Sequence, residues 1–190
     1  MMAQNFRRSA SNITICLINI NSFKDCSDDR TSDLTCLFNN SKAHIYIISE
    51  TKLNMDTAAK FNKNYLGKLW RHSPTTDMDA GAGVSIAYDP LMGRVEVLPM
   101  PAEIQNRTIA VQFLPPNAAP FIILGVYAPA SGSTAIKRNF INKVFETRTA
   151  LQQLHNCNII IGGDFNSTVG HLERSIISEP QHSSLILLPT

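Results

Sequence analysis

The sequence lacks the features that mark several large classes of protein. Its four cysteines form no CxxC pair and have no zinc-ligand spacing, so neither a zinc site nor a disulfide framework is predicted. No apolar run is long enough to span a membrane, and the short run near the N-terminus lacks the small-residue cleavage site of a signal peptide. These absences predict an intracellular protein, nuclear or cytoplasmic, with no membrane anchor.

Strong charge of either sign is absent as well. The formal net charge of the 190 residues is +2, and 17% of them are charged. Bulk attraction to nucleic acid is therefore weak, and a nucleic-acid-binding role requires a local site. The hydrophobic fraction of 44% suffices for a packed core, and no repeat or linker divides the chain. We expect one globular domain.

Runs of apolar and β-branched residues predict the regular elements. Strands are expected at 13–20, 45–49, 83–88, 94–98, 107–114, 121–127 and 158–162, and helices at 33–42, at 56–64 and from Ser133 or Thr134 to His155. The last helix is expected to pack through the stripe Ile136, Phe140, Val144, Leu151 and Leu154. The first helix joins two parallel strands, and the links between the four central strands are typical of antiparallel hairpins. This order predicts two sheets packed face to face with helices outside.

Residues 158–169, NIIIGGDFNSTV, place a carboxylate and an amide directly after a buried strand. Side chains alternate along a strand, so Asp164 and Asn166 share one side while Phe165 points to the core on the other. Gly162 and Gly163 remove side-chain bulk there, which permits unusual dihedral angles or the close approach of a ligand. A strand that ends in an Asx turn is the alternative interpretation of the same residues.

Three other predicted strands also end in polar side chains. Asn19 and Asn21 lie at the end of the first, Glu50 follows the second, and Tyr127 ends the strand 121–127. Ligands of open α/β sheets bind at the carboxyl ends of strands, which favours one shared site. Its oxygen-rich side chains, with two carboxylates and no histidine or cysteine, suit Mg²⁺ or Mn²⁺ and a phosphate ester. Solvated strand ends are the alternative for each residue taken singly.

The motifs LININ, SETK, GVYAP and GGDFN, in this order, resemble the endonuclease/exonuclease/phosphatase family, which has the DNase I-like fold. Within it, the chain is most similar to the apurinic-type endonuclease domains of LINE-type non-LTR retrotransposons, and the stretch GAGVSIAYDP shares this likeness. The resemblance extends from Ile13 to Val169. It implies an α/β fold, a four-layer α/β/β/α sandwich of two mixed β-sheets, that hydrolyses phosphodiesters with the help of a metal, with DNA as the expected nucleic-acid substrate.

The resemblance also carries roles onto six residues: metal binding for Glu50 and Asn19, phosphate binding for Asn21 and Asn166, and catalysis for Tyr127, Asp164 and Asn166. It implies that Tyr127 contacts the scissile phosphate, that Asp164 orients the attacking water, and that Asn166 supports Asp164. The implied cofactor is Mg²⁺ or Mn²⁺.

One departure from the family pattern limits these expectations. The family ends in further strands with an essential histidine in a Ser-Asp-His segment, and this sequence contains no such segment. His171 and His182 follow GGDFN without that context, and we interpret them as ordinary surface histidines. The expected organisation is a flexible N-terminus at 1–12, an incomplete, C-terminally truncated domain at 13–170 and a divergent tail at 171–190. A catalytically silent remnant of the fold is therefore the alternative to an active endonuclease.

Overall fold

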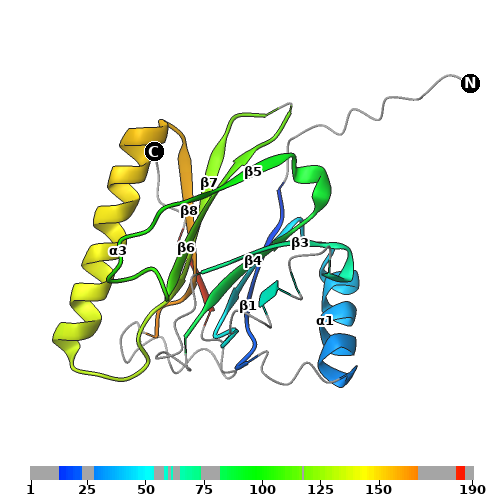
Figure 1. Ribbon diagram of the computed structural model, residues 1–190, viewed down its shortest axis with the longest axis horizontal. Coiled ribbons are helices and arrows are strands. Elements are labelled where there is room, and N and C mark those ends of the chain that lie inside the picture. Colours follow the sequence, from blue (N-terminus) through cyan, green and yellow to red (C-terminus); the bar gives the residue numbers. More distant parts are fainter. Residues whose placement is uncertain are drawn as a thin grey trace, which may run out of the picture.

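Two stacked β-sheets, each with a helix along its outer face, make up the computed structural model (Figure 1). The structure describes residues 13–22, 28–53, 58–59, 61, 65–73, 82–116, 118–166 and 183–186. Helix α1 (Asp28–Ser41) lies outside the first sheet, and helix α3 (Thr134–His155) lies outside the second. This arrangement confirms the expected four-layer sandwich. No helix in the described part of the chain is long and apolar enough to cross a membrane.

The first sheet has the strand order β1-β2-β4-β3. These strands are β1 (Ile15–Asn19), β2 (Ile45–Ser49), β4 (Val84–Tyr88) and β3 (Leu69–His72). β1 and β2 are parallel, as the sequence predicts for a β-α-β unit, whereas β4 is antiparallel to both of its neighbours. The sheet is therefore mixed.

The second sheet has the order β5-β6-β7-β8-β9. These strands are β5 (Arg94–Leu98), β6 (Thr108–Leu114), β7 (Phe121–Tyr127), β8 (Asn158–Asp164) and β9 (Ser183–Ile186). β5, β6 and β7 form the expected antiparallel hairpins, and the crossover through α3 makes β8 parallel to β7. β9 is antiparallel to β8, so this sheet is also mixed.

Several local expectations are wrong. The β4–β5 link, which contains the short 3₁₀ helix η2 (Pro90–Met92), joins two different sheets and is not a hairpin. Helix α1 begins at Asp28 rather than residue 33, and the 3₁₀ helix η1 (Tyr65–Gly67) and strands β3 and β9 were not predicted. In the expected helix 56–64, residues 58, 59 and 61 are helical, and the other residues of that range lie outside the described part of the chain.

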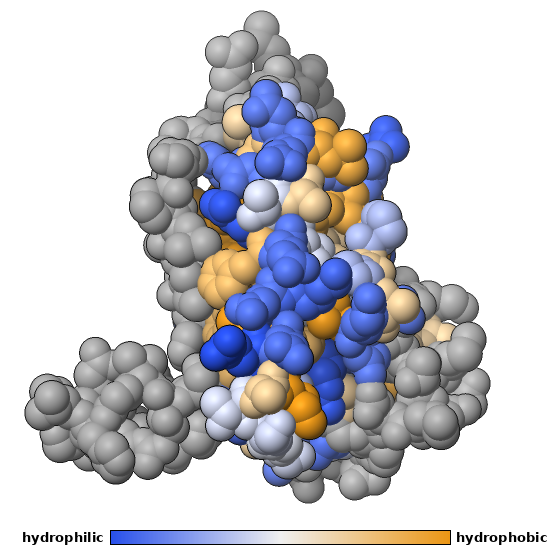
Figure 2. All heavy atoms as spheres, turned by 90° about the vertical axis from the view of Figure 1, so that its left-hand side faces the viewer, coloured by the Kyte–Doolittle hydropathy of each residue, from blue (hydrophilic) through white to orange (hydrophobic). Residues whose placement is uncertain are grey.

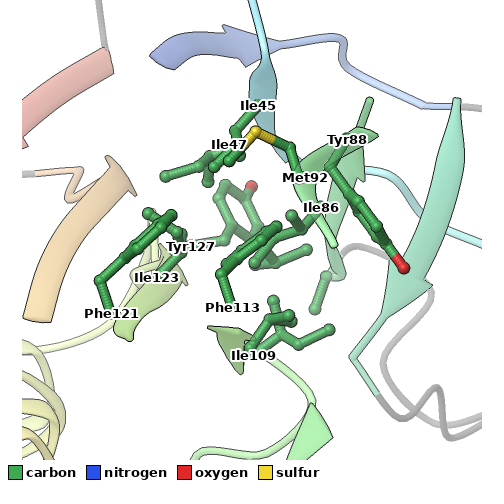
Figure 3. Close-up of a cluster of buried hydrophobic side chains, with 13 residues drawn as sticks. Ile45, Ile47, Ile86, Tyr88, Met92, Ile109, Phe113, Phe121, Ile123 and Tyr127 are labelled. Carbon is green, nitrogen blue, oxygen red and sulfur yellow. The ribbon is translucent and has the colours of Figure 1, made fainter. Parts of the chain in front are cut away.

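The core between the two sheets is built by alternate residues of the central strands (Figure 3). The labelled side chains come from β2, β4, β6 and β7 and from η2: Ile45, Ile47, Ile86, Tyr88, Met92, Ile109, Phe113, Phe121, Ile123 and Tyr127. The intervening residues face outwards to the helices. On the first sheet they pack with Leu34 and Phe38 of α1, and on the second with Phe140 and Val144 of α3. This alternation fixes which strand residues face the space between the sheets.

The buried stripe of α3 differs in part from the expected one. Phe140, Val144 and Leu151 are buried as predicted, but Ile136 and Leu154 are 55% and 77% exposed. At 3.6 residues per turn these two lie about 50° around the helix from the centre of the buried face. Thr147 completes that face, and its hydroxyl donates to the Lys143 carbonyl oxygen at 2.8 Å. Figure 2 shows the α3 side of the molecule, where hydrophobic side chains are scattered among hydrophilic ones.

Candidate active site

Polar side chains lie where β1, β7 and β8 end, on the side that faces the other sheet. Asn19 continues the alternation of Ile15 and Leu17, which pack against the core between the sheets. Tyr127 belongs to that core (Figure 3), and its register partner across the parallel pair of β7 and β8 is Asp164. Strand alternation therefore directs side chains from both sheets into one region.

A hydrogen bond joins the ends of the two sheets. The Nδ2 of Asn19 at the end of β1 donates to Oδ2 of Asp164 at the end of β8, at 2.8 Å. Asp164 is only 2% exposed, whereas Asn19 is exposed. A buried carboxylate needs hydrogen-bond donors to offset its lost hydration, and Asn19 supplies one from the opposite sheet.

The second oxygen of Asp164 organises the chain that follows the strand. The backbone N–H of Asn166 donates to Oδ1 of Asp164 at 2.9 Å, which is the geometry of an Asx turn. Asn166 adopts φ 44°, and its Nδ2 donates to the Ala128 carbonyl oxygen at 2.7 Å. Phe165 is 8% exposed and packs towards α3, as the alternation predicts. The Asx turn and the candidate site are thus the same structure, not alternatives.

The charges of both acids of the site act on Tyr127. Burial raises the pKa of its hydroxyl, and the charges of Glu50 and Asp164 raise it further, while Arg107 and the side chain of Asn166 lower it. The hydroxyl therefore stays protonated at neutral pH, so it can donate a hydrogen bond to an anionic oxygen. The Arg107 guanidinium lies over the Tyr127 ring, 5.4 Å from its centroid, and adds a positive charge beside it.

Glu50 and Asn21 are linked through a lysine. The Lys52 ammonium lies 2.9 Å from Oε1 of Glu50 and donates to Oδ1 of Asn21 at 3.1 Å. The backbone N–H of Asn21 donates to Oδ1 of Asn19 at 3.1 Å, so a continuous set of contacts runs from Glu50 to Asp164. The structure therefore brings all six residues named from the sequence into one connected region.

Backbone conformation at the site is unusual. Of the eight non-glycine residues with positive φ in the described part of the chain, five belong to these strand ends: Asn21, Ser22, Glu50, Lys52 and Asn166. Such conformations are unfavourable for residues with a Cβ and cluster at functional sites. The segment after β2 is held by hydrogen bonds from the N–H groups of Thr51 and Lys52 to the carbonyl oxygens of Gly83 and Ala82.

The structure explains why residue 163 is a glycine, which the sequence alone did not reveal. A Cβ at this position would lie 1.9 Å from the Val126 carbonyl oxygen, and φ is 141°. The residue is therefore required by the close approach of β7 to β8, next to the Tyr127–Asp164 pair, and not simply by the space that a ligand needs.

The donor set can be compared with what a metal requires. Among the described residues, no group of three or more His, Cys, Asp and Glu side chains is placed to hold a metal ion. Glu50 instead offers one carboxylate beside the amide oxygen of Asn21, with Oδ1 of Asn19 one contact further. Mg²⁺ is commonly held by one or two carboxylates together with waters and substrate phosphate, so hard oxygen donors of this kind fit it.

Sequence reasoning missed two cationic residues of this region. Lys52 lies in the quoted motif SETK, but its contact with Asn21 depends on how β1 and β2 end side by side. Arg107 precedes β6, and only the antiparallel register of β6 and β7 brings it to Tyr127, whose N–H donates to the Arg107 carbonyl oxygen at 2.8 Å. His171 and His182 lie outside the described residues.

Of the comparisons with known proteins, the one with solved structures shows the fold. No model of a protein family matches the chain, and no curated protein sequence matches it. Among solved structures, the AP endonuclease LMAP from Leishmania major is similar with a TM-score of 0.60 and 17% identity over 80% of this chain and 54% of the other. The endonuclease domain of TRAS1, a telomere-specific non-LTR retrotransposon, gives 0.55 and 17% over 82% and 61%.

A third solved structure has a different described activity. ANGEL2, described as a 2′,3′-cyclic phosphatase, is similar with a TM-score of 0.63 and 14% identity, over 83% of this chain and 54% of the other. This chain thus spans between about half and two thirds of the length of these three proteins. The likeness concerns the fold, which is the DNase I-like fold of the endonuclease/exonuclease/phosphatase proteins.

Proposed function

We propose that this chain carries a divalent-metal-dependent phosphodiesterase site that acts on DNA, as an endonuclease of retroelement type. The observation that carries the proposal is the hydrogen bond between Asn19 and Asp164. It joins the ends of the two sheets at a buried carboxylate, which the register of β7 and β8 pairs with Tyr127 and which accepts the backbone N–H of Asn166. A carboxylate that can orient water and neutral donors that can stabilise the transition state are two of the three parts that phosphate-ester hydrolysis requires, and a cation is the third.

Asp164 is proposed to hold the attacking water. Each of its oxygens accepts one hydrogen bond, from Asn19 and from the backbone of Asn166, and a carboxylate oxygen can accept a second. The two donors fix the orientation of the carboxylate, and the remaining acceptor capacity is available to a water molecule. Preorganisation of this kind contributes to rate because the group does not need to reorient during the reaction.

Tyr127 and Asn166 are proposed to contact the scissile phosphate. The hydroxyl of Tyr127 keeps its proton because burial and two nearby acids raise its pKa, and it can therefore donate to a phosphoryl oxygen. The Arg107 guanidinium beside its ring adds a charge that favours an anionic ligand in a region that otherwise contains two carboxylates.

Glu50, Asn19 and Asn21 are proposed to hold Mg²⁺ or Mn²⁺. When bound, the metal would neutralise charge on the phosphoryl oxygens. Glu50 supplies the anionic ligand, and the amide oxygens of the two asparagines belong to the same contact network. Asn21 is also proposed to contact the substrate phosphate, since its side chain is exposed at the rim of the region.

DNA is the proposed substrate because two of the similar structures are described as an AP endonuclease and a retrotransposon endonuclease domain. The described activity of ANGEL2 makes RNA-derived or small cyclic phosphates the competing substrate class. Comparing supercoiled plasmid, single-stranded RNA and a 2′,3′-cyclic nucleotide under one set of conditions distinguishes these substrates.

The test of the proposal is nicking of supercoiled plasmid in Mg²⁺. We expect slow nicking by the purified chain and its loss in Asp164→Asn, which keeps the shape of the side chain but removes its charge. Asp89→Asn is the matched control. Asp89 directly follows β4, and its Oδ1 also accepts the backbone N–H two residues ahead, that of Leu91, at 2.8 Å. Nicking that survives Asp164→Asn would contradict the proposed role of Asp164.

A catalytically silent domain is the second candidate. Among the described residues, the hydrogen bonds of Asp164 and Asn166 connect them to amides, backbone groups and Tyr127, and none connects them to a histidine. A missing acid–base or charge-stabilising group lowers rates by about 10²–10⁴-fold. Metal binding without nicking, together with nicking by a fusion that supplies a Ser-Asp-His segment, would support this candidate.

A further inference from the structure

The contacts of Lys52 differ from those of an ordinary surface lysine. Its ammonium lies 2.9 Å from Oε1 of Glu50, 3.1 Å from Oδ1 of Asn21 and 3.4 Å from the Asn21 carbonyl oxygen. An ammonium has three N–H donors, and three oxygens surround this one. The oxygens comprise a carboxylate, a side-chain amide and a backbone carbonyl, which are the ligand types that hard divalent cations take in proteins.

The chain adopts unfavourable backbone conformations where it makes these contacts. Asn21, Glu50 and Lys52 have φ values of 55°, 58° and 50°, in the left-handed region. The side chains of Lys52 and Glu50 are 21% and 19% exposed, so the pair is partly shielded from solvent. Another lysine–glutamate pair, Lys143 with Glu146 on α3, is longer at 3.4 Å, is 39% and 66% exposed, and needs no such backbone.

We propose that the Lys52 ammonium occupies the cation position of this site, as a built-in counter-ion that a divalent metal must displace. Without metal, it neutralises Glu50 and keeps the Asn21 oxygens directed at one point. With metal, two cations cannot share the same oxygens a few ångströms apart without strong repulsion. The ammonium then moves away from Glu50, and its charge becomes available to the substrate phosphate.

This inference deepens the proposed function, on which it rests, because it specifies what controls metal affinity at Glu50. A resident ammonium lowers the affinity of the site for a divalent ion, because each metal ion that binds must first displace Lys52. The site therefore fills only at high metal concentration. The sign of this effect distinguishes a counter-ion from a residue that only positions the metal ligands. A positioning residue would strengthen metal binding, whereas a counter-ion weakens it.

The test is a Mn²⁺ titration of the full chain, followed by electron paramagnetic resonance of free Mn²⁺, with no substrate present. We expect Lys52→Met and Lys52→Gln to bind Mn²⁺ at least about tenfold more tightly, because a nearby like charge has been removed. Lys52→Arg keeps the charge and should not gain affinity. Lys143→Met is the matched control, because it removes a lysine that is also paired with a glutamate, on the outer face of α3.

The outcomes separate this inference from the proposed metal site. Unchanged or weaker Mn²⁺ binding in both neutral Lys52 variants, together with loss of binding in Glu50→Gln, would overturn the counter-ion and leave the site intact. Mn²⁺ binding that is indifferent to Glu50→Gln in both the native and the Lys52→Met background would overturn the proposed site itself. Tighter binding in the neutral variants that disappears when Glu50→Gln is added supports both.

Discussion

Replacing Gly163 with alanine tests how closely β7 and β8 are joined beside the candidate site. In the present structure, a Cβ on residue 163 would lie 1.9 Å from the Val126 carbonyl oxygen and 2.8 Å from its carbonyl carbon. Real Cβ atoms essentially never approach another heavy atom within 3.0 Å, so the two strands must separate by about 1 Å, the difference between 3.0 and 1.9 Å. The backbone, and not a flexible side chain, has to move.

The expected loss of stability is large for a single methyl group. A side chain at unfavourable φ costs about 1–3 kcal/mol, and the steric overlap adds to it, so we expect a total of about 4 kcal/mol. For a chain of this size that corresponds to a melting temperature lower by about 10 °C. Since Tyr127 and Asp164 are the next register pair, a shift of about 1 Å also displaces the candidate site, and nicking should fall by about 10²-fold.

Gly67→Ala is the matched control for this experiment. Gly67 also has positive φ, 72°, but a Cβ there would meet nothing within 4 Å. Its substitution should therefore cost only the backbone term, about 1 kcal/mol. The assay is urea unfolding of both variants followed by circular dichroism. Equal stability of the two variants would show that the close contact with the Val126 carbonyl is not the reason for a glycine at residue 163, and it would refute the reasoning.

Three further predictions follow from the site and from β3. Asn19→Ala removes the donor to Asp164 Oδ2 and should lower the free energy of unfolding by about 1–3 kcal/mol in urea titrations, whereas no change would mean that the bond between the sheets contributes nothing. Tyr127→Phe keeps the ring in the core, so stability should change by about 1 kcal/mol or less while nicking falls about 10²-fold; equal nicking would exclude a phosphate contact. Burial, reinforced by the Arg71 charge, lowers the pKa of His72 in the folded chain from 6.5 to about 4. As the pH falls, the unfolded chain therefore protonates this histidine before the folded chain does, and the free energy of unfolding should fall between about pH 6.5 and 4. The loss is at most about 3 kcal/mol, and His72→Phe should remove that slope from pH-dependent unfolding curves.

Strands with uniform apolar runs could be predicted closely from the sequence. β2 and β7 have the expected bounds, because every residue of both strands is buried and polar or breaker residues flank them. β5 also has the expected bounds, although it is not a uniform apolar run, because Gly93 and Pro99 delimit it. β3 was missed because its four residues include Arg71 and His72, and burial of Trp70 against Phe61 is visible only in three dimensions. Short strands with charged residues depend on their neighbours, which local pattern does not reveal.

The site could be predicted only in part. Alternation along β8 predicted that Asp164 and Asn166 share a side. In the structure β8 ends at Asp164, the backbone N–H of Asn166 donates to its side chain, and Asn19 donates to its other oxygen. The assigned roles stay predictions. Lys52 and Arg107 could not be found, because their partners lie 31 and 20 residues away and depend on the register of other strands.

The account depends most on the claim that four strand ends form one metal and phosphate site. The direct measurement is paramagnetic broadening of backbone amide NMR signals during a substoichiometric Mn²⁺ titration. We expect the signals of residues 19–21, 50–52, 127–128 and 164–166 to broaden first and together, and to recover on addition of a chelator. Broadening that begins on the outer face of α3, or at one of these strand ends without the others, would contradict the claim.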